Sequence, residues 1–310
     1  MVLKTSYERP TEIPFPEDNP FSAAKAELGK TLYFDPRLSR SNMQSCASCH
    51  SPSFAWGDGL AKGVGDHMHE LGRRSPTILN AAWSEVLMWD GRFDTLEEQA
   101  LGPIEADVEM NMPLDELIAK LSKIEGYREL FAAAFEGDRD ITADKIAMAI
   151  ATYERTIVSG EAPFDRWVNA ERKALSASAE RGFELFNGKA RCAACHSGWR
   201  FTDDSFHDIG LADDDLGRGT EFPGIVKMQH AFKTPGLRNI DQRAPYMHDG
   251  SLATLAEVVE HYDGGGVRRP SLSDDMKPLD LTKQEKRDLV AFMESLTSDD
   301  EPVTYVQLPR

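Results

Sequence analysis

Two copies of one short motif contain all four cysteines of the chain. Each copy has two cysteines separated by two residues and followed directly by a histidine: Cys46-Ala47-Ser48-Cys49-His50 and Cys192-Ala193-Ala194-Cys195-His196. This is the attachment pattern of a c-type haem, in which the thiols bond the porphyrin and the histidine binds the iron. The sequence therefore predicts two covalently bound haem c groups, with His50 and His196 as axial iron ligands.

Four cysteines have two other common uses, a zinc site and redox-active pairs. Zinc-binding pairs usually lie about 15–20 residues apart, whereas these motifs stand in different halves of the chain. A redox-active pair does not need a histidine after its second cysteine. Both uses remain alternatives, and the repeated histidine disfavours them.

The composition restricts the partners of the protein. The 310-residue chain has 41% hydrophobic residues, which is ordinary for a globular protein, and a formal net charge of −17. The negative charge argues against nucleic acid and anionic membranes as partners, and no apolar run reaches the roughly 18 residues of a membrane span. A small basic electron-donor protein would be attracted to such a surface, although solubility alone also explains the acidity.

The cellular location follows from the haem chemistry. Covalent haem attachment in bacteria takes place outside the cytoplasmic membrane, so we expect a periplasmic protein. The first ten residues contain no apolar signal core, and we expect that an export leader not visible in this chain was removed.

Helix signals precede both motifs. Serine or threonine caps and apolar spacings of three and four predict helices over 22–30, 142–158 and 282–296. A further helix over 178–186 precedes the second motif as 22–30 precedes the first, so the chain contains a weak internal repeat. The run 96–100 predicts another helix, which Gly102-Pro103 should end.

No alternating strand pattern stands out in the chain, so the predicted fold class is mostly α. The repeat and the two motifs together indicate two cytochrome-c-like domains, each carrying one covalently attached c-type haem. We expect the first domain over residues 1–165 and the second over residues 166–310.

Further blocks occur in order along nearly the whole chain. They include Leu28-Gly29-Lys30, Phe34-Asp35-Pro36-Arg37-Leu38-Ser39, Ser75-Pro76-Thr77, Trp89-Asp90-Gly91-Arg92, Gly102-Pro103-Ile104, Thr234-Pro235-Gly236-Leu237-Arg238-Asn239 and Pro245-Tyr246-Met247-His248-Asp249-Gly250. With the two haem motifs, these blocks resemble the bacterial dihaem cytochrome c peroxidase and MauG family. The resemblance implies a peroxidatic N-terminal haem domain and a C-terminal electron-transfer haem domain.

Four residues gain catalytic roles from this resemblance. Trp89 would relay electrons or holes between the haems, although alone it is typical of a core tryptophan. Glu109 matches a distal-pocket glutamate that moves a proton between the two peroxide oxygens. Any one of the 52 acidic residues is otherwise more often a solvated surface charge. Gln99 and Pro103 match positions that line the pocket.

The sixth iron ligands differ within the family. Peroxidases place a loop histidine on the oxidised N-terminal iron, and His67 matches it, whereas MauG leaves that iron open; an exposed loop histidine is the alternative. At the second haem, Tyr262 stands where peroxidases have methionine and MauG has tyrosine. Met247 is the runner-up, and His261 is a third candidate. A thioether raises a haem potential, whereas a phenolate favours oxidised iron, so Tyr262 makes a state with two high-valent irons plausible.

The chain departs from the family at its calcium site. The family binds calcium through an asparagine before the Ser-Pro-Thr block and a threonine before Pro-Tyr, where this chain has Arg74 and Arg243. Calcium requires oxygen ligands. We therefore predict that calcium is absent.

Three functions follow from these observations. The first is an enzyme, a dihaem peroxidase that reduces H₂O₂ and takes electrons from a small cytochrome c or cupredoxin-type protein. The second is a MauG-like oxidant that modifies aromatic residues of a partner protein, with Trp199 as a candidate exit point for holes. The third is a dihaem electron carrier without catalytic activity. No nucleic acid partner and no membrane span are expected.

Overall fold

Serine and threonine side chains begin the long helices, as their positions in the sequence predict. The hydroxyls of Ser22, Thr142 and Thr282 each accept a hydrogen bond from the backbone N–H three residues later, at 3.1–3.2 Å. These bonds satisfy donors that the first helical turn leaves unpaired. The helices predicted over 22–30, 142–158 and 282–296 are confirmed, with ends that differ by a few residues.

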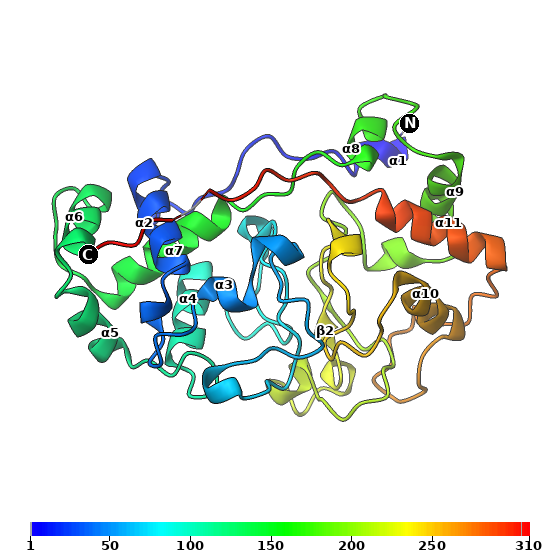
Figure 1. Ribbon diagram of the computed structural model, residues 1–310. Coiled ribbons are helices and arrows are strands. Elements are labelled where there is room, and N and C mark those ends of the chain that lie inside the picture. The colour runs from blue at the N-terminus through cyan, green and yellow to red at the C-terminus, as the bar shows by residue number, and fades with distance from the viewer. Residues whose placement is uncertain (1, 305) are drawn as a thin grey trace. The chain divides into compact units, whose positions relative to one another are not determined.

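The computed structural model describes residues 2–304 and 306–310 and is mostly helical, which confirms the predicted fold class (Figure 1). The helices are α1 (Val2–Thr5), α2 (Ala23–Tyr33), α3 (Cys46–Cys49), α4 (Leu96–Glu105), α5 (Leu114–Leu121), α6 (Glu125–Ala134), α7 (Ala143–Arg155), α8 (Pro163–Val168), α9 (Ala177–Asn187), α10 (Leu255–Gly264) and α11 (Lys283–Glu294). Strands β1 (Phe206–His207) and β2 (Phe232–Lys233) pair antiparallel. Among the described residues no helix is long and apolar enough to cross a membrane.

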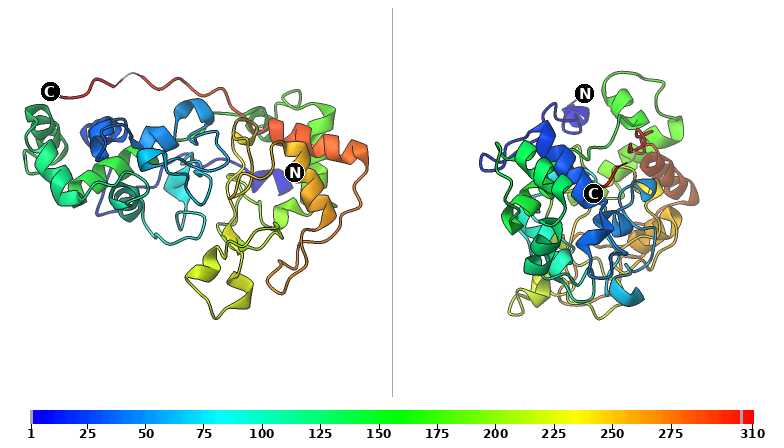
Figure 2. Two further views of the ribbon diagram at one scale, coloured as in Figure 1. Left: turned by 60° about the horizontal axis from the view of Figure 1, so that its bottom comes forward. Right: turned by 60° about the vertical axis from the view of Figure 1, so that its left-hand side comes forward.

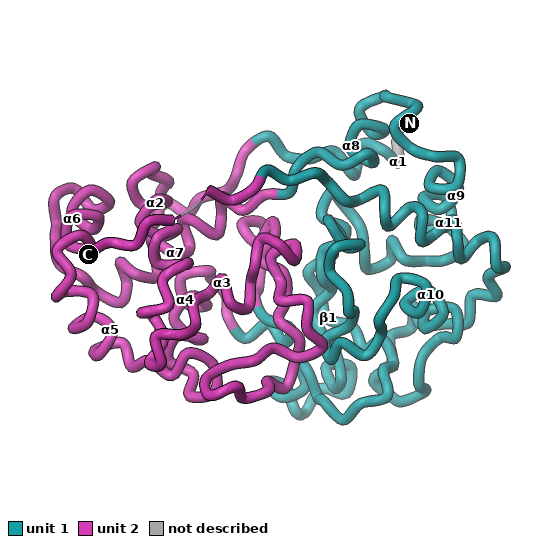
Figure 3. The backbone as a smooth tube through the Cα atoms, in the orientation of Figure 1, with its two compact units in different colours: residues 1–11, 88–92, 159–301 teal, residues 12–87, 93–158, 302–310 magenta. Residues whose placement is uncertain are grey.

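The chain divides into two compact units that exchange segments (Figure 3). The N-terminal unit contains residues 12–87, 93–158 and 302–310, and the C-terminal unit contains residues 1–11, 88–92 and 159–301. Each unit contains one of the two haem motifs. The sequence predicts two contiguous haem-binding domains, over residues 1–165 and 166–310. These limits stay a prediction.

In the N-terminal unit, α2 packs across α7 at a glycine. A Cβ on Gly29 would overlap the carbonyl oxygen of Ala149 and would lie 2.9 Å from Tyr153 Cβ, so only glycine lets the helices approach this closely. The last turn of α2 leads through Tyr33 to the loop before α3. The closing residues of the chain return to this unit, where Gly126 N donates to Arg310 O at 3.3 Å.

The C-terminal unit repeats this arrangement with α9 and α11. A Cβ on Gly182 would overlap the carbonyl oxygen of Asp288 and would lie 2.7 Å from Phe292 Cβ. Helix α10 packs beside α11, as two further views show (Figure 2). Gly29 and Gly182 stand at matching places of the internal repeat, and each belongs to the helix that precedes a haem motif.

Helix α4 corrects one prediction. The helix does not end at Gly102-Pro103 but continues through Pro103 to Glu105. Proline removes one N–H and crowds the carbonyl four residues earlier, but only two residues of the helix follow Pro103, and Ala106 N still donates to Gly102 O at 3.0 Å. The following chain folds back, and Met110 N donates to Pro103 O at 3.1 Å while Met112 N donates to Ile104 O at 2.8 Å.

Candidate haem sites

The first motif forms helix α3 and the residue that follows it. Ser45 N donates to Ser48 Oγ at 3.0 Å, and His50 N donates to Cys46 O at 2.9 Å. The Tyr33 hydroxyl donates to His50 O at 2.7 Å, which fixes the backbone of the histidine from α2. Burial lowers the pKa of His50, so its imidazole is neutral at pH 7, as an iron ligand must be.

The cysteines of the two motifs are free thiols that form no disulfide. Burial raises the pKa of Cys46, raises that of Cys49 to about 11 and raises that of Cys192 to about 12. Partly buried thiols at this spacing, each pair followed by a histidine, fit covalent haem attachment. A thiolate–zinc site would instead bring the two pairs together, and they belong to separate units.

The second motif opens into a largely apolar cavity of the C-terminal unit. His196 Nδ1 donates to Phe201 O at 2.9 Å, which leaves Nε2 as the ring atom available to a metal. The cavity is lined by Cys192, Cys195 and His196 at one side and by apolar side chains from α9, α10 and α11. Apolar walls around one oriented imidazole fit a haem.

Two of the three candidate sixth ligands line this same cavity. Tyr262, near the end of α10, and Met247 both do so, whereas His261 is not among the lining residues. His261 Nε2 instead donates to Ile209 O at 2.9 Å. Burial raises the pKa of Tyr262, so only a bound cation such as iron would make its phenolate stable near neutral pH. The choice between Tyr262 and Met247 stays a prediction.

Trp89 belongs by its contacts to the C-terminal unit, although it precedes that unit's main segment by seventy residues. Its carbonyl accepts from Lys233 N at 2.8 Å, and its indole lines the second cavity. The Trp89 and His248 rings meet edge to face at 6.3 Å, and His248 stacks on Phe232 at 3.6 Å. Trp89 is therefore held in an aromatic group at the wall of the second haem site.

Glu109, Gln99 and Pro103 belong to the N-terminal unit. Gln99 and Pro103 are four residues apart in α4, so they share one face of the helix. All three are half-buried, whereas Glu105 is exposed. Beyond burial, the negative charges of Asp58 and Glu109 also raise the pKa of the Cys49 thiol, so Glu109 lies near the first haem motif.

The glycine-rich loop that carries His67 packs against the Glu109 segment. A Cβ on Gly65 would overlap the Val108 carbonyl oxygen, and Asp66 N donates to that oxygen at 3.2 Å. The His67 side chain itself is 89% exposed, and its Nε2 atom lies 3.7 Å from Asp66 Oδ2. The imidazole points into solvent in this structure, so ligation of the first haem iron would require the loop to rearrange.

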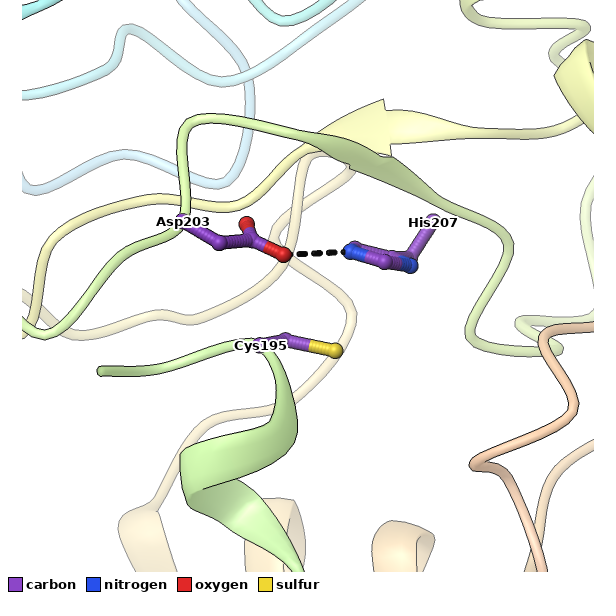
Figure 4. Close-up of side chains that lie close together, drawn as sticks. All are labelled: Cys195, Asp203 and His207. Carbon is purple, nitrogen blue, oxygen red and sulfur yellow. Dashed lines mark hydrogen bonds and ion pairs between the residues drawn. The ribbon is translucent and has the colours of Figure 1, made fainter.

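Two groups near the motifs escaped the sequence analysis. Asp203 and His207 lie beside Cys195, where His207 Nε2 and Asp203 Oδ2 are 2.8 Å apart (Figure 4). The hydrogen bond to Asp203 is the main cause that raises the pKa of His207 to about 10. These three residues have a spacing suited to a metal, but Cys195 is required for haem attachment, so they form part of the second haem site. The other group is Glu154, a carboxyl that is only 4% exposed.

No sequence signal distinguishes these groups. Asp203 and Glu154 are two of 52 acidic residues, and His207 is not at a recognised spacing from either motif.

The two arginines at the expected calcium positions, Arg74 and Arg243, are both buried. Arg243 donates a hydrogen bond to Gly236 O. Burial is the main cause that lowers the pKa of His196, and the charges of His207 and Arg243 lower it further.

A mostly helical chain with two Cys-x-x-Cys-His motifs, one of them opening into an apolar cavity, defines the class of dihaem c-type cytochromes. The family model for di-haem cytochrome c peroxidase matches residues 23–173, and the model for cytochrome c matches residues 179–297. The chain belongs to the di-haem cytochrome c peroxidase/MauG family. The predictions of this family, of two cytochrome-type haem domains and of an oxidoreductase of the peroxidase type are confirmed.

Relatives match over nearly the whole chain. The chain is 53% identical to the methylamine utilization protein MauG of Methylorubrum extorquens, over 99% of this chain and 88% of that protein. It is 35% identical to the cytochrome c551 peroxidase of Nitrosomonas europaea, over 90% of this chain and 82% of that protein. The solved structure of a MauG-like protein associated with microbial copper homeostasis superimposes with a TM-score of 0.87 at 32% identity, covering 94% of this chain and 95% of that one.

Proposed function

We propose that this protein reduces H₂O₂ at the N-terminal haem, with Glu109 as the group that moves the proton. The observation that carries the proposal is the half-buried position of Glu109, close enough to the first haem motif for its charge to act on the Cys49 thiol. When bound to His50, the haem supplies an iron that accepts the oxidising equivalents of peroxide.

The protein residues have separate tasks in this reaction. Reduction of H₂O₂ consumes two electrons and two protons and yields two molecules of water. The Glu109 carboxylate takes the proton from the oxygen that binds first and returns it to the oxygen that leaves, which makes the leaving group water instead of hydroxide. Gln99 and Pro103, on one face of α4, line the site and restrict the approach of solvent.

We also propose that oxidising equivalents are shared with the C-terminal haem through Trp89. The position of Trp89 at the wall of the second cavity supports this role, because a haem bound in that cavity would have Trp89 as one of its neighbours. Tyr262 as the second axial ligand, in place of Met247, would let that site hold oxidising equivalents. The electrons would come from a small donor protein of the cytochrome c or cupredoxin type.

A second function is favoured by the 53% identity to a methylamine utilization protein MauG. In this function the oxidising equivalents leave through an aromatic side chain and modify aromatic residues of a partner protein. Trp199 is half-buried in the C-terminal unit, beside the guanidinium groups of Arg9 at 5.6 Å and Arg238 at 6.0 Å. Part of this residue is therefore accessible to a partner.

The remaining assignments rest on chemistry. Covalent haem attachment supports a periplasmic location. Arginine at positions 74 and 243 supports a site without calcium, since a guanidinium cannot be a calcium ligand. His67 as a ligand of the oxidised first iron is proposed only for a rearranged loop, because its side chain is exposed here.

The test compares Glu109→Gln with Glu105→Gln in the holoprotein. Glu105 is exposed at the end of the neighbouring helix, so it controls for the loss of one charge. We expect kcat/KM for peroxide-dependent oxidation of a reduced c-type cytochrome to fall about 10²–10⁴-fold in Glu109→Gln and to stay near wild type in Glu105→Gln. Unchanged turnover in Glu109→Gln would remove the proton-transfer role. Peroxide consumption that depends on an oxidisable protein, and not on the cytochrome, would favour the second function.

A further inference from the structure

A buried carboxyl group of the N-terminal unit has no part in the function proposed above. Glu154 lies near the end of α7, with 4% of its surface exposed, and its Oε2 atom has no hydrogen-bond partner among the described residues. The adjacent Arg155 is paired with another carboxylate, because both of its terminal guanidinium nitrogens donate to Glu97 at 2.6 and 2.8 Å. An unpaired charge in a buried position is unfavourable, so burial favours the protonated, neutral form of the carboxyl.

The surroundings of Glu154 connect it to the first haem motif. Its charge acts on the Cys46 thiol and on the Tyr33 hydroxyl, and this hydroxyl donates to His50 O at 2.7 Å. The titratable and charged groups that face it, by element, are Tyr33 from α2, Cys46 from α3, Glu97 from α4, and Tyr153 and Arg155 from α7. The carboxyl therefore lies on the side of the site where Cys46 would be bonded to the porphyrin.

Glu154 is the member of this group that exchanges a proton near neutral pH. Burial raises its pKa to about 8, against the charge of Arg155 and together with that of Glu97. Against the opposing effect of burial, hydrogen bonds from Arg155 and Asn19 hold the pKa of Glu97 below its ordinary value. Burial raises the pKa values of Tyr33 and Tyr153, and Cys46 loses its proton permanently when the thioether forms.

We propose that Glu154 is the proton acceptor that is coupled to reduction of the first haem. When the iron gains one electron from the donor, the carboxylate binds one proton from solvent, and oxidation of the iron releases that proton again. The physical cause is repulsion in a weakly polar interior, where an added electron and a carboxylate charge are poorly screened from each other. The proposal rests on haem attachment at Cys46 and Cys49, which is part of the proposed function.

The test is a redox titration of the holoprotein between pH 6 and pH 10, with the two haems resolved by EPR. Coupling of one proton to one electron makes a tenfold change in proton concentration shift the redox equilibrium tenfold, which is about 59 mV. In the wild type we expect the potential of the first haem to change little below about pH 8, where Glu154 is already protonated in the oxidised protein, and to fall with pH by up to this slope above it. We expect the slope to disappear in Glu154→Gln, where the side chain keeps its shape and is always neutral.

Glu27→Gln is the matched control. Glu27 is an exposed carboxylate on α2 whose charge also acts on Tyr153, as that of Glu154 does. Its loss should leave the slope of the first haem unchanged. A second measurement needs no variant. At pH 9, where Glu154 of the oxidised protein is mostly ionised, the infrared difference spectrum between reduced and oxidised wild-type protein should contain the carbonyl stretch of one protonated carboxylic acid on the reduced side.

The outcomes separate this inference from the proposed function. A slope in Glu154→Gln equal to that of the wild type, or no carboxylic acid band on reduction, would overturn the role of Glu154 while peroxide turnover continued. Loss of the slope in Glu154→Gln supports the role even if peroxide turnover proves absent, which would overturn only the proposed function. Absence of covalent haem at Cys46 and Cys49 would overturn both.

Discussion

Gly182, where α9 and α11 cross, should contribute to the stability of the C-terminal unit and to the packing around the second haem site. The perturbation is Gly182→Ala, which adds one methyl group where the two helices meet. That methyl would overlap the Asp288 carbonyl oxygen and would lie 2.7 Å from both Asp288 C and Phe292 Cβ. Because two of these atoms are helix backbone, no side-chain rotation can relieve the overlap, and the helices must separate.

The magnitude follows from two opposing effects. Overpacking of a well-packed core typically costs about 1–3 kcal/mol, and a rigid backbone obstacle places this case at the upper end. Replacing glycine by alanine inside a helix returns about 1 kcal/mol of helix propensity. The expected net loss is about 2 kcal/mol, which corresponds to a fall in Tm of about 4–8 °C for a unit of this size.

The same movement should reach the haem. Helix α9 ends five residues before Cys192, and α11 contributes Leu289 and Met293 to the wall of the cavity. Separation of the two helices would loosen the packing around the His196 haem. We therefore expect the absorption and EPR spectra of the second haem to broaden or shift, while those of the first haem stay as in the wild type.

The assay is thermal unfolding of the holoprotein followed by circular dichroism and by haem absorption. Gly264→Ala is the control, because Gly264 ends α10 in the same unit and a Cβ there would meet nothing within 4 Å. Its Tm should be equal to or slightly above that of the wild type. A Gly182→Ala protein that unfolds at or above the wild-type Tm, with unchanged haem spectra, would refute the close-packing argument.

Two further predictions concern single side chains. Tyr262→Phe should raise the reduction potential of the second haem and change its ferric EPR spectrum, because it removes a phenolate that stabilises oxidised iron. Met247→Leu should change neither the potential nor the spectrum. The reverse result would make Met247 the ligand. Glu154 should make the wild-type protein less stable as the pH rises from 4.5 to 8. Its pKa is about 8 in the folded chain against an ordinary value of 4.5, so between these pH values the carboxyl is protonated only in the folded state. At about 1.4 kcal/mol per pH unit, the full effect is on the order of 5 kcal/mol. Urea unfolding at pH 9 should therefore find Glu154→Gln more stable than the wild type, and equal stability at that pH would contradict the buried position of the carboxyl.

Local features of the chain were readable without the structure. Haem attachment depends on a contiguous motif. The helix starts at Ser22, Thr142 and Thr282 each depend on a hydroxyl and an N–H three residues later. Residues close together in the sequence therefore determine both kinds of feature. The end of α4 was predicted wrongly because the chain after the helix donates hydrogen bonds to the carbonyls of Pro103 and Ile104, which hold the last turn in place despite the proline.

Only the tertiary structure decided the environments of the remaining groups. Burial and charge at Glu154, the pairing of Asp203 with His207, and the membership of Trp89 in the C-terminal unit all depend on segments far apart in the sequence. The same holds for the exposure of the His67 side chain. The sequence by itself determined where two haems attach and which helices precede them, whereas packing determined which carboxyls and rings lie beside them, since desolvation and charge act through space.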